Sequence, residues 1–247
     1  MRLPLLAPTR RIFELALGEM LWSRRAWFMA LAAGGPVFLA VMTRMSLAGG
    51  SSALIINGRG VDSAATFHAA ISVLYLRFIV PALGVFYGTS LIADEVEDKT
   101  ITYLFTRPIA RGAIVLGKYL AYLLCVTSVV LPSVALMFVV MVPFRGMAAL
   151  FGTLVKDLGA VALGLAAYGA LFLLAGVSFR RAMVAGLVFV FGWEQIALVL
   201  PGYLRYLTIA YYLQAGTPSV VTLLLIIVAA VSFAMRTIES REYVLEQ

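Results

Sequence analysis

One string near the middle of the chain, GAIVLGKY at residues 112–119, has the spacing of a phosphate-binding loop. Such a loop reads G-x-x-x-x-G-K followed by Ser or Thr, whose hydroxyl binds the Mg²⁺ of a nucleotide. Here Tyr119 replaces that Ser or Thr, the four intervening residues are apolar, and Pro108 stands where the preceding strand would run. We therefore predict that the chain does not bind nucleotide. The string instead begins a membrane span, and Lys118 extends its charge to the water at the membrane surface.

The composition supports a membrane protein. The chain has 247 residues, of which 63% are hydrophobic and 13% charged, and its mean hydropathy is +1.01. Because soluble domains carry about 25% charged residues, this much apolar surface requires lipid as a solvent. The net charge of +7 does not indicate nucleic acid, since the basic residues are spread between apolar blocks. The single cysteine, Cys125, lies inside an apolar block and is interpreted as a packed residue.

Six apolar blocks are long enough to cross a bilayer, which takes about 20 residues. They run over residues 26–47, 69–92, 113–142, 158–179, 182–200 and 218–235. We predict an all-α membrane protein with one transmembrane domain over residues 1–247. Residues 10–27 place apolar side chains at helical spacing and predict an amphipathic helix lying on the membrane surface. The alternative is an ordinary charged flank.

The basic residues set the predicted orientation. If the N-terminus is cytoplasmic, thirteen of the 19 basic residues lie on the cytoplasmic side and five outside, which fits the positive-inside rule. The thirteen are Arg2, Arg10, Arg11, Arg24, Arg25, Lys99, Arg107, Arg111, Lys118, Arg180, Arg181, Arg236 and Arg241. The five are Arg44, Arg59, Arg145, Lys156 and Arg205. We predict a multi-pass protein of the inner (cytoplasmic) cell membrane with both termini in the cytoplasm.

An acidic cluster follows the second apolar block. Its four carboxylates are those of Asp94, Glu95, Glu97 and Asp98. Such a cluster can hold a hard cation, but no histidine lies near it, and His68 falls on the other side of the membrane. We therefore favour a solvated helix end over a metal site.

The next stretch, residues 100–105, is short and amphipathic. Thr100 or Asp98 can cap a helix there, and Pro108 disfavours its continuation. The apolar side chains that this helix would expose are Tyr103, Leu104 and Phe105. We predict one or two helical turns held at the inner membrane face and suited to insert into a groove on a partner protein.

This part of the chain resembles a known family. The stretch LIADEVEDKTITYLFTRPIARGAIVLGKYL (residues 91–120) resembles permease subunits of ABC-2 type ATP-binding-cassette transporters. In that family an acidic E-x-E-D-x-T box and a hydrophobic-R-P-I-x-R stretch precede the third of six spans. The segment FGWEQIALVLPGYLRYLTIAYYL (residues 191–213) resembles the fifth span of the family and its external connection. Lys99 stands where many members have glycine.

The resemblance implies a division of labour. A separate ATPase subunit, expected in two copies, would bind ATP and Mg²⁺, and this chain would be non-catalytic with no cofactor of its own. It would pair with a second copy of itself or with a homologous permease, and its short cytoplasmic helix would receive the movement of the ATPase. The residues assigned to this coupling interface are Asp94, Glu95, Glu97, Asp98, Thr100, Tyr103, Leu104, Phe105, Arg107, Pro108 and Arg111.

Two charged residues inside the apolar blocks are candidates for a transport path or gate. Arg77 lies in the second block, where a charge costs about 2.5–3.5 kcal/mol, so it lines a path or extends to the external surface. Glu194 lies near the end of the fifth block, before a Pro-Gly turn. We predict a re-entrant or interfacial hairpin over residues 194–213, in which Glu194 lines a cavity or pairs with Arg205. The tyrosines of this segment are interpreted as an interfacial aromatic belt.

The preferred function is the permease subunit of an ABC exporter. One alternative keeps the same assembly but has it transmit mechanical work to an external partner protein. Another is an ATP-independent carrier or channel, which internal repeats would favour, but none is visible in the sequence. The sequence does not identify the substrate.

Overall fold

The computed structural model describes residues 6–48, 54–56, 59–61, 63–97, 111–179, 181–199, 203–214 and 217–240, and these are almost entirely helical. Five helices are long and apolar enough to cross a membrane, and a shorter apolar helix accompanies them. The five are Ala26–Met45, Thr66–Asp94, Arg111–Met141, Gly146–Ser178 and Val220–Ser240, and the shorter one is Ala182–Ala197. The predicted all-α membrane fold with about six spans is thereby confirmed.

The first half of the chain forms three spans. Its elements are α1 (Leu6–Trp22), α2 (Arg24–Ala48), β1 (Leu54–Ile56), β2 (Arg59–Val61), α3 (Ser63–Ala70), η1 (Ile71–Ile79), α4 (Val80–Leu83), η2 (Gly84–Gly88), α5 (Ser90–Glu97) and α7 (Arg111–Met141). The two strands pair as a small antiparallel hairpin. The second span is one continuous crossing in which η1 and η2 have the wider π-helical winding, a geometry often found at functional sites.

The second half adds three more crossings. Its elements are α8 (Phe144–Ser178), α9 (Ala182–Leu187), η3 (Val188–Glu194), α10 (Gln195–Val199), η4 (Tyr203–Leu207), α11 (Ile209–Gln214) and α12 (Thr217–Ser240). A third π-helical segment, η3, joins α9 to α10 within the fifth crossing. We call α10, η4 and α11 the distal corner.

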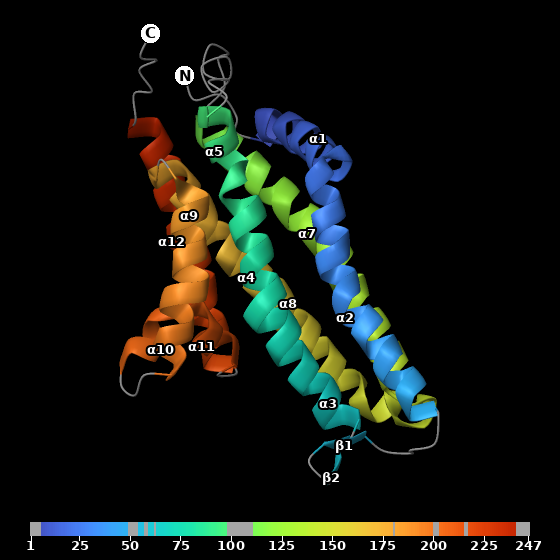
Figure 1. Cartoon of the computed structure of the whole chain (residues 1–247). Helices are drawn as coiled ribbons and strands as arrows, with labels where there is room; N and C mark the ends of the chain where they lie inside the picture. The colour runs from blue at the N-terminus through green and yellow to red at the C-terminus, as the bar shows by residue number, and fades with distance from the viewer. Residues whose placement is uncertain are drawn as a thin grey trace.

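The crossings give the bundle two distinct ends. The helix α1, the end of α5 and the last turn of α12 lie together at one end, called here the termini end (Figure 1). The helix α3, the small strand hairpin and the distal corner lie at the opposite end, the distal end (Figure 1). Residues near Asp94 and residues near Glu194 therefore belong to opposite ends of the bundle.

The helix α8 is longer than the fourth apolar block. It begins at Phe144, directly after the extended Pro143, whereas the apolar block begins at residue 158. The polar residues Lys156 and Asp157, which precede the apolar block in the sequence, lie within the helix. Lys156 is exposed, while Asp157 is buried and its Oδ1 lies 3.1 Å from Nδ1 of His68 on α3. The helix thus continues through a stretch that the sequence assigns to the connection between spans, and this contact gives its buried carboxylate a partner.

Buried tyrosines join the crossings at the centre of the bundle. The hydroxyl of Tyr75 lies 2.6 Å from that of Ser133 on α7. Tyr122 on α7 donates to the carbonyl oxygen of Leu165 on α8 at 3.1 Å. Because lipid offers no hydrogen-bonding partner, each hydroxyl must be satisfied inside the protein. Apolar side chains on the outer faces of α2 and α12 are exposed, as expected for surfaces in contact with lipid.

Candidate functional site

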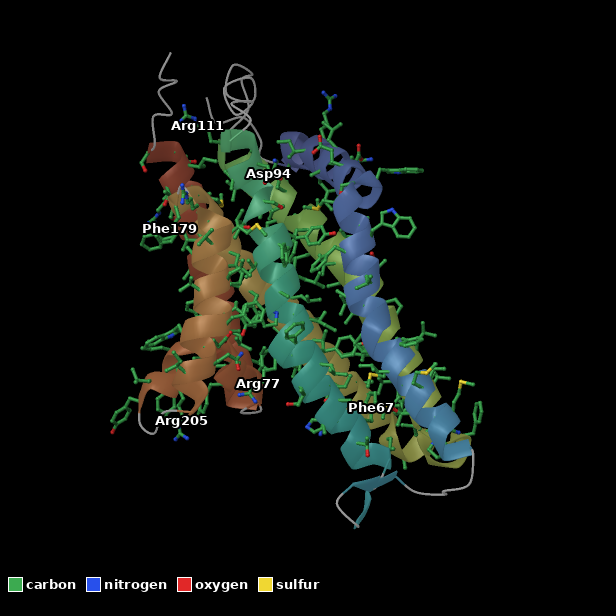
Figure 2. All side chains as sticks on the ribbon, viewed as in Figure 1. Phe67, Arg77, Asp94, Arg111, Phe179 and Arg205 are labelled. Atoms are coloured by element: carbon green, nitrogen blue, oxygen red, sulfur yellow. The ribbon has the colours of Figure 1, made fainter. Side chains whose placement is uncertain are left out.

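The predicted coupling residues fall largely outside the described part of the chain. Those outside it are Asp98, Thr100, Tyr103, Leu104, Phe105, Arg107 and Pro108. Glu95 and Glu97 are described only as backbone in the last turn of α5. The short helix and the cation-binding alternative therefore stay predictions. Asp94 and Arg111, which flank this segment, both lie at the termini end (Figure 2).

Arg111 connects the start of α7 to the end of α12. One terminal nitrogen of its guanidinium group lies 3.4 Å from the carbonyl oxygen of Ile238 and 3.4 Å from that of Glu239. A cation at the C-terminal end of a helix also interacts favourably with the helix dipole. The third and sixth spans are thus joined where the predicted coupling segment re-enters the bundle.

The string that resembles a phosphate-binding loop is helical and lies within α7. Its second glycine permits close packing, because a Cβ atom on Gly117 would lie 2.9 Å from the backbone oxygen of Thr9 on α1. The prediction that this string begins the third span is confirmed. The glycine and lysine spacing thus reflects helix packing in this fold.

The predicted position of Lys118 at the membrane surface is wrong. The residue is only 8% exposed, and its Nζ donates a hydrogen bond to the carbonyl oxygen of Leu91 on α5 at 2.8 Å. An ammonium group buried in a membrane domain requires such an acceptor. Lys118 therefore joins α5 to α7, the two helices that residues 98–110 connect in the sequence.

A cavity of about 540 Å³ opens at the termini end. It lies between the start of α2, the η2–α5 region and the start of α9. The residues that line it are Phe28, Phe86, Tyr87, Thr89, Ser90, Ala93, Asp94, Arg181, Ala182, Met183 and Val184. Its volume falls within the range of about 300–1,000 Å³ that is typical of small-molecule sites. Aromatic and aliphatic walls with one acidic and one basic residue suit an amphiphilic molecule.

The second polar site lies in the distal half, around Glu194. This residue is 1% exposed, and its Oε1 accepts a hydrogen bond from the hydroxyl of Tyr168 at 2.5 Å and another from the backbone N–H of Ala210 at 3.0 Å. Arg205 lies on η4 of the distal corner, and the predicted pairing with Glu194 is wrong: in the described part of the chain no ion pair joins the two. Arg205 is exposed, and its guanidinium carbon lies 5.4 Å from the ring centres of both Tyr206 and Tyr211.

Arg77 faces the same region from η1 in the second span (Figure 2). The side chain is half-buried, and its Nε is buried without a hydrogen-bond partner among the residues that the structure describes. Arg77 thus contributes to the electrostatic environment of Glu194 from another span, while Glu194, Tyr168 and Ala210 form the hydrogen-bonded cluster.

The fold defines a multi-pass membrane domain with a cavity at one end and a buried hydrogen-bonded cluster near the other. Residues 17–238 match the model of a family described as ABC-2 family transporter protein, and the chain therefore belongs to that family. No curated protein matches the chain. The resemblance drawn from residues 91–120 is confirmed.

Proposed function

We propose that this chain is the membrane-spanning permease subunit of an ABC exporter and that a separate ATPase subunit drives it. Membership of the ABC-2 family supports a permease that associates with an ABC ATPase in a membrane. In this proposal the termini end faces the cytoplasm of the cell, and the distal end faces outward. ATP hydrolysis takes place on the partner, and this chain is non-catalytic.

The observation that carries the proposal is the position of the cavity along α5, the helix that immediately precedes the predicted coupling segment in the sequence. Residues 98–110 connect α5 to α7, and Asp94 on α5 lines the cavity. One helical turn earlier, the Leu91 carbonyl is bound by Lys118 on α7. A movement imposed on residues 98–110 therefore displaces both helix ends together. The wall of the cavity moves with them.

The cavity is the proposed binding site for the substrate on which this movement acts. It opens beside the start of two spans, so an amphiphile in the inner leaflet can reach it without crossing the bilayer. Displacement of α5 would change the separation of Asp94 on one wall from Arg181 on the other, and with it the affinity for the bound molecule. A transport cycle requires such a difference in affinity between two conformations.

We further propose that the working assembly contains two ATPase subunits and a second permease, either a copy of this chain or a homologue. Each permease would present one segment 98–110 to one ATPase. The exposed apolar faces of α2 and α12 would contact lipid or the second permease.

Co-purification tests the coupling segment. The chain is purified from its native membranes with and without Leu104→Asp and Arg107→Glu, and ATP hydrolysis in the purified sample is measured. We expect the double variant to lose the ATPase, because a charge replaces an apolar anchor and a second charge is reversed. The control is Arg205→Glu, which reverses an exposed charge at the opposite end. Unchanged recovery of the ATPase with the double variant would refute coupling through this segment.

A further inference from the structure

The geometry points to Glu194 as a positioning residue that holds the distal corner closed against the bundle. In this inference, which rests on the proposed function, opening of the distal end for substrate release requires the hydrogen bonds of Glu194 to break. Glu194 itself need not touch the substrate. Its carboxylate sets the conformation of the segment that the substrate must pass.

The carboxyl group of Glu194 joins three elements that are distant in the sequence. Glu194 belongs to η3 in the fifth span, Tyr168 to α8 in the fourth, and Ala210 to α11 in the distal corner. A rearrangement that separates α11 from the fourth and fifth spans must therefore remove donors from this carboxyl group.

The packing around α11 shows why hydrogen bonds matter there. Ile209 and Ala210 are buried, and the side chain of Leu213 lies against Gly164 of α8, where a Cβ atom would be 3.1 Å from Leu213 Cδ1. In contrast, all five residues of η4 are exposed. The described contacts that seat the corner against the bundle are therefore those of α11, and η4 adds no buried residue to them.

The chemistry of the cluster gives the closed state its strength. The Tyr168 hydroxyl and the Ala210 backbone N–H are both directed at one carboxyl oxygen of Glu194. Exclusion of water strengthens such buried hydrogen bonds, and a buried group that loses its partner is costly. Removing a single donor is therefore expected to shift the closed–open equilibrium substantially while the apolar contacts of α11 stay in place.

Labelling of a reporter cysteine tests this inference in the assembled complex with its ATPase. Cys125 is replaced by alanine, and Leu213→Cys places a thiol at the contact with Gly164. A membrane-impermeant maleimide is applied from the distal side of sealed vesicles, with Tyr203→Cys, at an exposed position of η4, as the reference for full access. The measured quantity is the labelling rate of the Leu213→Cys variant relative to the reference.

Three variants of the reporter protein distinguish loss of a hydrogen bond to Glu194 from a general loosening of the packing. Tyr168→Phe removes one donor to Glu194 and keeps the ring, and Glu194→Gln keeps an acceptor but removes the carboxyl group. The matched control is Tyr122→Phe, which removes a buried tyrosine hydroxyl that donates to α8 outside the cluster. We expect roughly tenfold faster labelling with Tyr168→Phe, from the loss of a buried hydrogen bond, faster labelling with Glu194→Gln, and little change with Tyr122→Phe. Equal rates in the Tyr168→Phe and unmodified backgrounds, or equal increases with Tyr168→Phe and Tyr122→Phe, would overturn the role of Glu194.

Addition of ATP distinguishes failure of this inference from failure of the proposed function. In the unmodified background, ATP should raise the labelling rate, and Tyr168→Phe should raise it without ATP. An effect of ATP with no effect of Tyr168→Phe would overturn the role of Glu194 and leave the ATP-driven exporter standing. An effect of Tyr168→Phe with no effect of ATP would support closure by Glu194 and contradict the ATP-driven function.

Discussion

The ammonium group of Lys118 lies 2.8 Å from the carbonyl oxygen of Leu91, and this hydrogen bond joins the second and third spans, which residues 98–110 connect in the sequence. Leu91 follows Thr89, which directly precedes α5, and Ser90, the first residue of α5, and both of these line the cavity at the termini end. One buried lysine is therefore placed to make two helix ends move together. Its position gives the coupling hypothesis a structural basis within the described part of the chain.

Replacement of Lys118 should weaken coupling while leaving the ATPase bound. Lys118→Met keeps the apolar stem but removes the donor to Leu91, which should destabilise the protein by about 1–3 kcal/mol. We expect the variant to co-purify with the ATPase and to show a smaller ATP-dependent change in maleimide labelling of the Ser90→Cys variant in the cavity. The control is Lys156→Met, at an exposed lysine of α8. If both lysine variants kept the full ATP response, Lys118 would have no part in coupling.

Replacement of two different glycines of α8 by alanine should affect the stability of the protein differently. A Cβ atom on Gly176 would lie 2.5 Å from the backbone oxygen of Thr89, whereas none of the described atoms lies within 4 Å of one on Gly159. Gly176→Ala should therefore cost about 1–3 kcal/mol through overpacking. Gly159→Ala should be neutral or stabilising by up to about 1 kcal/mol, because alanine favours the helix.

Thermal unfolding in detergent measures this difference. The fraction of each variant that stays monodisperse is followed as the temperature rises, and the unfolding temperatures are compared. The two variants share a chemical change and a helix, so their comparison isolates the contact with Thr89. Equal unfolding temperatures would contradict the close approach of the second and fourth spans.

The helix α1 should lie in the membrane surface. Its buried face, which includes Ile12 and Ala16, packs against the bundle, while Leu15 and Trp22 are 70% and 93% exposed. We expect the fluorescence of Trp22, in a Trp27→Phe and Trp193→Phe background, to be quenched by lipids brominated near the headgroup. Lipids brominated near the end of the acyl chain should quench less, because an interfacial helix reaches only about 5–10 Å into the bilayer. Absence of quenching by either lipid would place α1 in water.

The sequence predicts the spans well because their signal is local. A run of about 20 apolar residues is sufficient to identify a crossing, and the acidic box and Arg-Pro stretch identify the family. The position of Lys118 could not be predicted, because it depends on a backbone carbonyl 27 positions away in the chain. The partner of Asp157 in α8 could not be predicted for a similar reason, since His68 lies in another helix, 89 positions away in the chain.

The cluster around Glu194 is predictable from the sequence only in part. Hydropathy identifies Arg77 and Glu194 as unusual, but it does not identify Tyr168 and Ala210, which approach Glu194 only through folding. One signal was available, because a tyrosine inside an apolar block requires a hydrogen-bonding partner. The sequence contains several such tyrosines, and only the packing of α8 against η3 selects Tyr168.

The most direct test of the central claim measures access to the two ends of one complex. Chain and ATPase are reconstituted in vesicles, and impermeant maleimide is applied from the termini side to the Ser90→Cys variant and from the distal side to the Leu213→Cys variant. We predict that ATP slows labelling at the first position and speeds it at the second, and that an ATPase disabled in hydrolysis does not support repeated cycling between the two. Labelling that ATP leaves unchanged at both positions would contradict the account of this chain as an ATP-driven permease.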